Sequence, residues 1–193
     1  ATTSAWRALL SDRRFVRFTL AGGCAQAAMF AYIAGSSFVL IELFGVAADD
    51  YGFFFGANAT ALIAASQLNR RLLSSTTPDV ITRWSARAVV VAAVLVVVAG
   101  VATSSLWALA AALFVFLGTL GFVTPNTGAL ALDGQGARAG LASAVMGCSQ
   151  FALAALAAAA VSALHDGTAL PMVGVMAVLS TVSWLLLETA PRR

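Results

Sequence analysis

The sequence predicts an all-α membrane domain of six transmembrane helices, and three observations lead to this fold class. The chain is 61% hydrophobic and only 10% charged, whereas soluble domains carry about 25% charged residues. The charged residues divide the chain into uncharged stretches close to the length of about 20 residues that a membrane-spanning helix needs. When the chain is folded back and forth across a membrane, all eleven basic residues fall on one side. The positive-inside rule makes that side cytoplasmic, so both termini are expected there.

Residues 1–17 are predicted to be a cytoplasmic lead-in, in which the amphipathic stretch 12–17 lies at the membrane interface. Residues 18–193 are predicted to form the transmembrane domain. The first span is placed at 18–41, which is a stretch of 24 residues without a charge. The second span is placed at 51–69, a stretch of 19 uncharged residues. Both stretches are long enough to cross the hydrocarbon core of a bilayer.

The longest uncharged stretch, 88–132, contains 45 residues and is long enough for two helices. Spans three and four are therefore placed at 86–103 and 106–127, with a Thr-Ser-Ser hairpin between them. Span five is predicted at 139–164, where 26 residues lack a charge. Span six is predicted at 168–187, within a stretch of 21 uncharged residues. The result is a multi-pass membrane protein with three connections on the side opposite to its termini, between spans one and two, three and four, and five and six.

The six spans differ in the polarity of their side chains. Spans three and six carry few polar groups, whereas spans one, two, four and five carry amides and hydroxyls. An amide in hydrocarbon is costly unless it faces a helix partner or a water-filled cavity. We therefore expect spans one, two, four and five to surround a cavity and spans three and six to lie outside it. Two cavity helices followed by one peripheral helix, repeated once, is the pattern of a 3+3 inverted-repeat transporter half.

Amide, hydroxyl, aromatic and methionine side chains in these four spans are the candidates for contact with a ligand. Met and aromatic residues suit a large and variable ligand, although aromatic residues in membrane helices also serve packing and interface anchoring. Each amide would equally be explained by hydrogen bonding across helices. The candidate cavity residues are Gln26, Met29, Phe30, Tyr32, Ser36, Asn58, Phe122, Asn126 and Gln150.

Several other functions are disfavoured by the sequence. The arginines are spread over every predicted cytoplasmic loop as topology signals, so no nucleic-acid partner is expected. His165 is the only histidine and no Gly-x-Ser-x-Gly motif occurs, so no enzyme is expected. No His, Cys or carboxylate cluster has metal-ligand spacing, so neither metal nor cofactor is expected. No ionisable side chain lies in the middle of a span, so a proton-coupling residue is expected outside this chain.

Several short motifs, in this order along the chain, carry a resemblance to a known family. They are Phe-Ala-Tyr-Ile-Ala-Gly-Ser-Ser-Phe-Val-Leu at 30–40, Phe-Gly-Val at 44–46, Tyr-Gly-Phe-Phe-Phe-Gly-Ala-Asn at 51–58, Gln-Leu-Asn-Arg-Arg-Leu-Leu at 67–73, Pro125-Asn126, and Gly-Leu-Ala-Ser-Ala at 140–144 with Gly147 and Gln150. Together they resemble helices seven to twelve of the Bcr/CflA (bicyclomycin-resistance) drug transporters, which are twelve-helix drug:proton antiporters of the major facilitator superfamily. One departure is Ser37, where many members of that family have a proline that would kink the helix.

The resemblance implies that the chain is the C-terminal half of a proton-coupled multidrug efflux transporter in the bacterial inner membrane. Residues 1–17 would then be the end of the central cytoplasmic loop. The implied partners are the lipid bilayer, an N-terminal six-helix half or a second copy of the chain, a small amphipathic drug-like substrate and protons. Asn69, Arg70 and Arg71 would form a cytoplasmic gate latch or serve as topology anchors. The alternative is a stand-alone six-helix half-transporter, or a non-transporting membrane component, that homodimerises.

Overall fold

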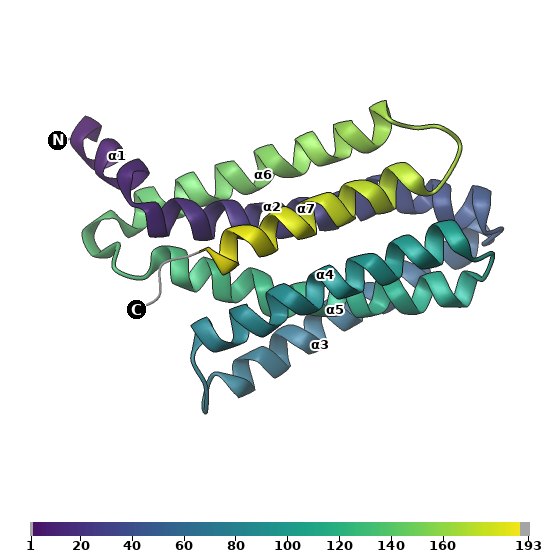
Figure 1. The fold of residues 1–193 in the computed structure, drawn as a ribbon, viewed down its shortest axis with the longest axis horizontal. Helices are drawn as coiled ribbons and strands as arrows, with labels where there is room; N and C mark the ends of the chain where they lie inside the picture. The colour runs from purple at the N-terminus through teal and green to yellow at the C-terminus, as the bar shows by residue number, and fades with distance from the viewer. Residues whose placement is uncertain (1, 190–193) are drawn as a thin grey trace.

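The computed structural model describes residues 2–189, which form a long helical bundle without a β-strand in that range (Figure 1). Six helices of 19 to 27 residues run back and forth along the bundle, and three shorter helical segments accompany them. The predicted all-α architecture is therefore confirmed. In chain order the elements are α1 (Thr2–Ser11), α2 (Arg13–Ser37), the π-helix η1 (Phe38–Leu43), α3 (Ala48–Leu72), α4 (Pro78–Ala102), α5 (Leu106–Leu132), the 3₁₀-helix η2 (Gly136–Arg138), α6 (Ala139–Ala163) and α7 (Leu170–Glu188).

The two ends of the bundle differ in charge. The α3–α4 and α5–α6 connections lie at the same end as α1 and the end of α7, and the other three connections lie at the opposite end (Figure 1). Every arginine among the described residues belongs to the first of these ends, which we call the arginine end. The opposite end carries Glu42, Asp49, Asp50 and Asp166 and is called the acidic end. Arg192 and Arg193, which were predicted to follow span six on the arginine side, lie outside the described residues.

Five helical segments within the described residues are long and apolar enough to cross a membrane, rather than the six predicted. The exception is α3, which has the length of a span but opens with Asp49 and Asp50 and ends with Arg70 and Arg71. Its middle also carries amides and hydroxyls. Nevertheless α3 runs alongside α5 in the same bundle (Figure 1). Packing against α5 compensates for the polarity, because it supplies hydrogen-bond partners that lipid cannot provide.

Span one begins earlier than predicted. The carboxylate of Asp12 accepts hydrogen bonds from the amides of Arg14 and Phe15, at 3.0 and 3.1 Å, and so caps the N-terminus of α2. The helix therefore starts at Arg13, and the stretch predicted to lie at the interface is its first turn. The separate helix α1 precedes it. Arginines are tolerated in this turn because it lies at the end of the span, where long side chains extend to the membrane surface.

The six long helices form two triplets in chain order, α2–α3–α4 and α5–α6–α7, and helices of each triplet pack against those of the other. The first helix of the first triplet, α2, packs against α6 and α7 of the second triplet. In the same way α5, the first helix of the second triplet, packs against α3 and α4 of the first. The helices α2 and α5 also touch each other, and so do α4 and α7. This exchange of partners supports the predicted 3+3 arrangement, in which the third helix of each triplet is peripheral.

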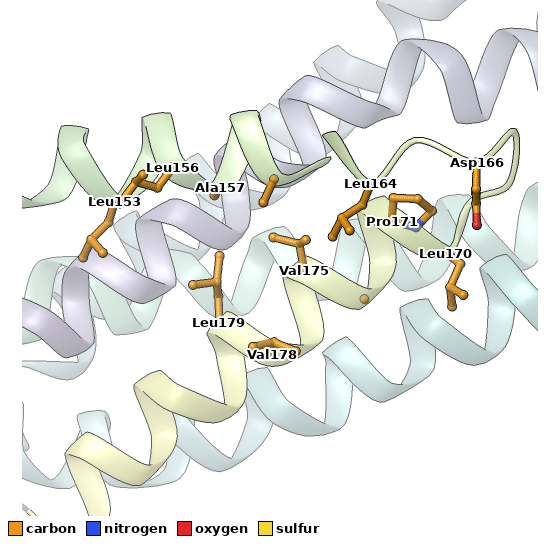
Figure 2. Close-up of a pocket in the computed structure, with 12 residues that line it drawn as sticks. Leu153, Leu156, Ala157, Leu164, Asp166, Leu170, Pro171, Val175, Val178 and Leu179 are labelled. Atoms are coloured by element: carbon orange, nitrogen blue, oxygen red, sulfur yellow. The ribbon is translucent and has the colours of Figure 1, made fainter. Parts of the chain in front are cut away.

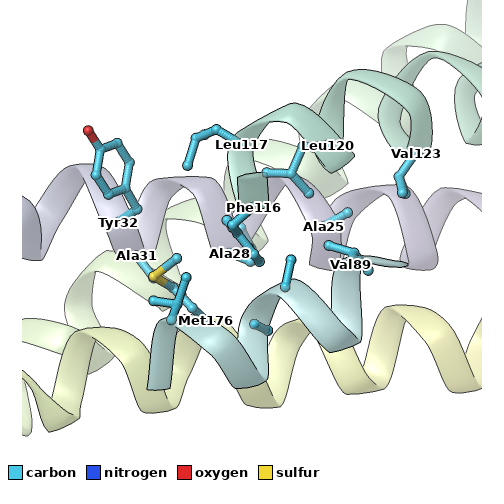
Figure 3. Packing of buried hydrophobic residues seen from close by; sticks show 14 of the residues in the cluster. Ala25, Ala28, Ala31, Tyr32, Val89, Phe116, Leu117, Leu120, Val123 and Met176 are labelled. Carbon is cyan, nitrogen blue, oxygen red and sulfur yellow. The ribbon is translucent and has the colours of Figure 1, made fainter. Parts of the chain in front are cut away.

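Small residues on α2 allow its neighbours to approach closely. Ala25, Ala28 and Ala31 are fully buried and lie along one stretch of the helix, where Phe116 of α5 and Met176 of α7 pack in the same cluster (Figure 3). A methyl group added at Gly35 would lie 2.8 Å from the Met172 side chain of α7. Close approach of backbones is the main source of packing energy between helices in lipid, where the hydrophobic effect contributes little.

Candidate functional site

Two of the predicted cavity residues of α2 join a polar network with α3 near the acidic end. The hydroxyl of Tyr32 accepts a 2.9 Å hydrogen bond from Asn58 Nδ2. One turn later, the hydroxyls of Ser36 and Tyr51 lie 2.8 Å apart and share a hydrogen bond. The Phe55 ring links the two pairs, because it stacks on Tyr32 at 6.0 Å and lies 6.1 Å from Tyr51. We call these five residues the α2–α3 network.

Three of the five residues of the α2–α3 network are buried, whereas Tyr51 is half-buried and Phe55 is exposed. Tyr32, Ser36 and Asn58 are respectively 2%, 0% and 4% exposed, so their polar atoms bond to one another in an apolar setting. The network sits immediately before Phe38, where α2 changes into the π-helix η1. π-helical turns inside longer helices occur frequently at functional sites. Ser37 is the last residue of α2, and the helix loses its regular α-helical hydrogen bonding directly after it, through the π-turns of η1.

A second polar pair joins α3 to α5 near the arginine end. Asn126 Nδ2 donates to Asn69 Oδ1 at 2.6 Å and to the Phe122 carbonyl at 2.7 Å. Both asparagines are almost completely buried, and Asn126 Oδ1 has no hydrogen-bond partner in the described part of the chain. Asn69 was predicted as a gate residue together with Arg70 and Arg71. In the structure only the two arginines are exposed, while Asn69 faces into the bundle.

The helices α3 and α5 meet most closely beside this asparagine pair. A methyl group added at Gly121 would lie 2.6 Å from the Leu62 carbonyl oxygen and 3.0 Å from the Ser66 amide nitrogen. The Ser66 hydroxyl donates to the carbonyls of Leu62 and Gly121, at 2.9 and 3.3 Å. The nearby Phe122 ring lies 5.0 Å from that of Trp84 in the peripheral helix α4. The glycine therefore brings α3 near enough for side chains to bond across the contact.

The remaining candidates on α2 form a partly exposed stripe. Gln26, Met29 and Phe30 are half-buried, whereas Ile33 and Ser37 are exposed. Their spacing of three or four residues places them on one face of the helix. The Phe30 ring makes an edge contact at 6.3 Å with Phe151 of α6. We call these residues the α2 stripe. It is the open side of a helix whose other sides are covered by α5, α6 and α7.

Gln150, the last candidate, lies at the contact between α2 and α6. Methyl groups added at Gly22 and Gly23 would lie 3.9 Å from its Nε2 and 3.8 Å from its Cα, respectively. The structure thus divides the nine predicted residues among four places, namely the α2–α3 network, Phe122 and Asn126 of α5, the α2 stripe and this contact, and does not gather them in one site. Whether these residues bind a substrate stays a prediction.

Two residues of the α2–α3 network, Tyr51 and Phe55, were not among the predicted site residues. The signal that identifies them is their spacing: residues 51, 55 and 58 follow one another at i, i+4 and i+7, so they share one face of α3 with Asn58. Tyr32 and Ser36 share a face of α2 in the same way. When hydroxyl, amide and aromatic residues share one face on each of two consecutive helices, a network between these helices is predicted.

A polar junction at the arginine end was also not anticipated. Gln135 Nε2 donates to Asp12 Oδ2 at 2.9 Å, and Arg14 forms a 3.2 Å ion pair with Asp133. Partial burial by itself would raise the pKa of Asp12, but hydrogen bonds from the Phe15 amide, Gln135 and the Arg14 amide hold it below its ordinary value. The junction fastens the start of α2 to the α5–α6 connection.

The described residues contain no cluster of side chains that could hold a metal ion, since no group of three or more His, Cys, Asp or Glu residues there is placed to do so. What the described residues do present is an apolar bundle with paired buried amides, one open polar and aromatic stripe, and charges confined to its two ends. These features define a multi-pass, all-α membrane domain with two intertwined helix triplets, which is the architecture of a transporter half.

Comparison with known proteins supports this class. No family model matches the chain. It is 29% identical over 177 residues to the uncharacterized MFS-type transporter YdgK of Bacillus subtilis, a match that covers 92% of this chain and 44% of that protein. It is 25% identical over 184 residues to a bicyclomycin resistance protein homolog of Haemophilus influenzae, with 94% of this chain and 46% of that protein covered.

The chain spans about half the length of the curated relatives it matches. One relative is a transporter of the major facilitator type and the other bears the name of the family that the sequence motifs resemble. The predicted resemblance is thereby confirmed. The chain aligns with about half of an MFS-type transporter, and neither relative is described as an enzyme.

Proposed function

We propose that this chain is the C-terminal half of a proton-coupled multidrug efflux transporter of the bacterial inner membrane. Both termini would lie in the cytoplasm, because the arginine end would face the positive-inside compartment. The other six-helix half would complete a central cavity, and the two halves would rock against each other in alternating access. The substrate would be a small amphipathic drug-like molecule, as the name of the Haemophilus influenzae relative suggests.

The observation that carries this proposal is the α2 stripe. Among the candidate spans α2 has the largest buried share, yet one of its sides remains open and presents an amide, a thioether and an aromatic ring in Gln26, Met29 and Phe30. A lipid-facing helix would present aliphatic side chains on such a side, as α4 does. Polar and aromatic groups on an otherwise enclosed helix suit a water-accessible cavity between two halves.

Proton coupling would depend on the other half. Apart from Arg87, which pairs with Glu188, the charged residues of the described spans lie within about two turns of a helix end, so the stripe has no proton carrier at membrane depth. This half would therefore contribute surface to the cavity and hydrogen-bonding groups to the substrate. The titrating carboxylate would be supplied by the partner half.

The test is drug efflux from cells that express the full-length protein. Gln26→Ala and Phe30→Ala are expected to raise the accumulation of a fluorescent amphipathic dye several-fold. Val91→Ala is the control, because this residue is 61% exposed on the peripheral helix α4 and is expected to face lipid. Membrane levels of all variants would be compared by immunoblotting. Normal export by both stripe variants would exclude the α2 stripe from the transport route.

A further inference from the structure

The helices α6 and α7 are joined at the acidic end and separate toward the arginine end, and an open groove of about 560 Å³ lies between them (Figure 2). Apart from Asp166 its side chains are aliphatic, and they include Leu156 of α6, Leu164 directly after α6, and Val175 and Leu179 of α7. Asp166 is the one charged residue of its lining. Figure 2 shows this carboxylate on the α6–α7 connection, at one end of the groove beside Leu170.

Asp166 is held in a fixed position by its own connection. Its Oδ1 accepts hydrogen bonds from the Thr168 hydroxyl at 2.7 Å and from the Thr168 amide at 2.9 Å. Hydrogen bonds from the Thr168 hydroxyl and amide also lower the pKa of this carboxyl from its ordinary value. At neutral pH the groove therefore ends in an ionised and oriented carboxylate.

The charges around Asp166 reinforce its negative potential. The other charged residues of the acidic end are Glu42, Asp49 and Asp50, and its connections contain no arginine or lysine. His165 lies next to Asp166 and contacts the Phe38 ring at 4.5 Å. A negatively charged ligand group would be repelled from this surface, whereas an ammonium group would be attracted.

The dimensions of the groove match one leaflet of a bilayer. From Leu170 to Leu179 the helix α7 rises by about 14 Å, which is roughly half of the 30 Å thickness of the hydrocarbon core. A chain that enters at Asp166 would end near the middle of the membrane. The aliphatic lining offers such a chain dispersion contacts along its whole length.

We infer that this groove binds one acyl chain of a membrane phospholipid whose headgroup carries a primary ammonium group, with that ammonium beside Asp166. The aliphatic wall selects for a hydrocarbon chain and the carboxylate selects for the headgroup charge. A second groove of about 530 Å³, between α3 and α5, provides a contrast. Its lining includes Phe53, Trp107 and Phe114 and no charged side chain, so it has no group that would distinguish phospholipid headgroups.

Native mass spectrometry of the full-length protein tests the inference. The protein is incubated in detergent with equal amounts of phosphatidylethanolamine and phosphatidylglycerol that have identical acyl chains. We expect the first bound lipid to be phosphatidylethanolamine with about a two- to fivefold preference, as expected for an exposed ion pair. Asp166→Asn is expected to abolish this preference. Equal retention of the two lipids by the unmodified protein, or an unchanged preference in the variant, would overturn the inference.

A groove-filling variant tests the acyl site separately from the headgroup. A Cβ atom added at Gly174 in the groove would meet no atom within 4 Å, so Gly174→Leu is expected to extend into the groove without distorting α7. The same holds for Gly128 in α5, which lies outside the groove and provides a matched control. Gly174→Leu should reduce bound phosphatidylethanolamine while Gly128→Leu leaves it unchanged. If both variants bind as much lipid as the unmodified protein, the groove is not the binding site.

Discussion

Individual buried polar side chains connect the helices of this bundle in pairs. Asn58 bonds to Tyr32, Asn126 bonds to Asn69, and the Ser183 hydroxyl of α7 donates to the Ala21 carbonyl of α2 at 2.8 Å. Each such bond contributes about 0.6 to 2 kcal/mol in a membrane. Their directional geometry sets the relative depth of two helices, which apolar packing specifies only weakly.

The asparagine pair is expected to show a measurable interaction energy. Asn69→Ala and Asn126→Ala should each destabilise the protein, because each leaves the other amide buried without its partner. In a double-mutant cycle the coupling should be about 0.6 to 2 kcal/mol, measured as the unfolding free energy of the purified protein in mixed micelles. Gln67→Ala, at an exposed position of the same helix, is the control and should not couple to Asn126→Ala. A coupling of zero for the pair would show that the bond contributes nothing to stability.

The two tyrosines of the α2–α3 network are expected to differ in their contribution. Tyr32→Phe keeps the ring that stacks on Phe55 but removes the acceptor of Asn58, so the buried amide loses its partner. We expect a loss of about 1 kcal/mol. Tyr51→Phe should cost less, because Tyr51 is only half-buried and the Ser36 hydroxyl, once released, can turn to a carbonyl of its own helix. Thermal unfolding of both variants gives the order of stability, and equal midpoints would contradict the network as described.

At the scale of a single element, α3 shows that neighbouring helices can stabilise a helix that is too polar to be surrounded by lipid. It is too polar to qualify as a span by its own composition, but its amides Asn58 and Asn69 are bonded to α2 and α5 respectively. Close contact is a condition for these bonds. The glycine at position 121 supplies it on the α5 side, since no larger residue fits between the backbones.

A methyl group at the α3–α5 contact is therefore expected to separate the two helices. Gly121→Ala would place its Cβ 2.6 Å from a backbone oxygen of α3, and backbone atoms cannot rotate away as a side chain can. We expect a loss of about 1 to 3 kcal/mol, typical of overpacking. Gly128 lies about two turns further along the same helix, where an added Cβ would meet no atom within 4 Å. Gly128→Ala should therefore be neutral or stabilising, because alanine favours the helix. Unfolding midpoints in detergent measure both changes, and equal effects would place the closest contact elsewhere.

The number, order and approximate ends of the helices were predictable from the positions of charged residues, because a charge is excluded from the hydrocarbon whatever the tertiary structure. The starts of α2 and α4 were not, since Asp12 caps α2 among arginines and α4 begins at Pro78 rather than at the predicted residue 86. The distribution of the candidate residues over separate places in the bundle could not be predicted from the sequence either. Asn126 and Asn69 are 57 positions apart, and only the depth and rotation of α3 against α5 decide that they meet.

At the scale of the whole molecule, charge is distributed along a single axis. The arginine end is fastened by ion pairs and hydrogen bonds between segments distant in sequence, including Arg87 with Glu188 at 2.9 Å and Arg17 with the Thr189 carbonyl. The acidic end has short connections and the groove that ends at Asp166. Such an arrangement suits a membrane with a negative cytoplasmic surface at the arginine end.

The orientation follows as a prediction for the full-length protein in intact cells. Single cysteines replacing Ala48 and Ser104, both at the acidic end, should react with a membrane-impermeant maleimide added outside. A cysteine replacing Ser75, in the α3–α4 connection at the arginine end, should react only after the membrane is permeabilised. The natural Cys24 and Cys148 are first replaced by alanine, because Cys148 is exposed in the isolated chain. Labelling of position 75 from outside, with protection of 48 and 104, would invert the orientation and move both the arginine end and the termini to the outer side.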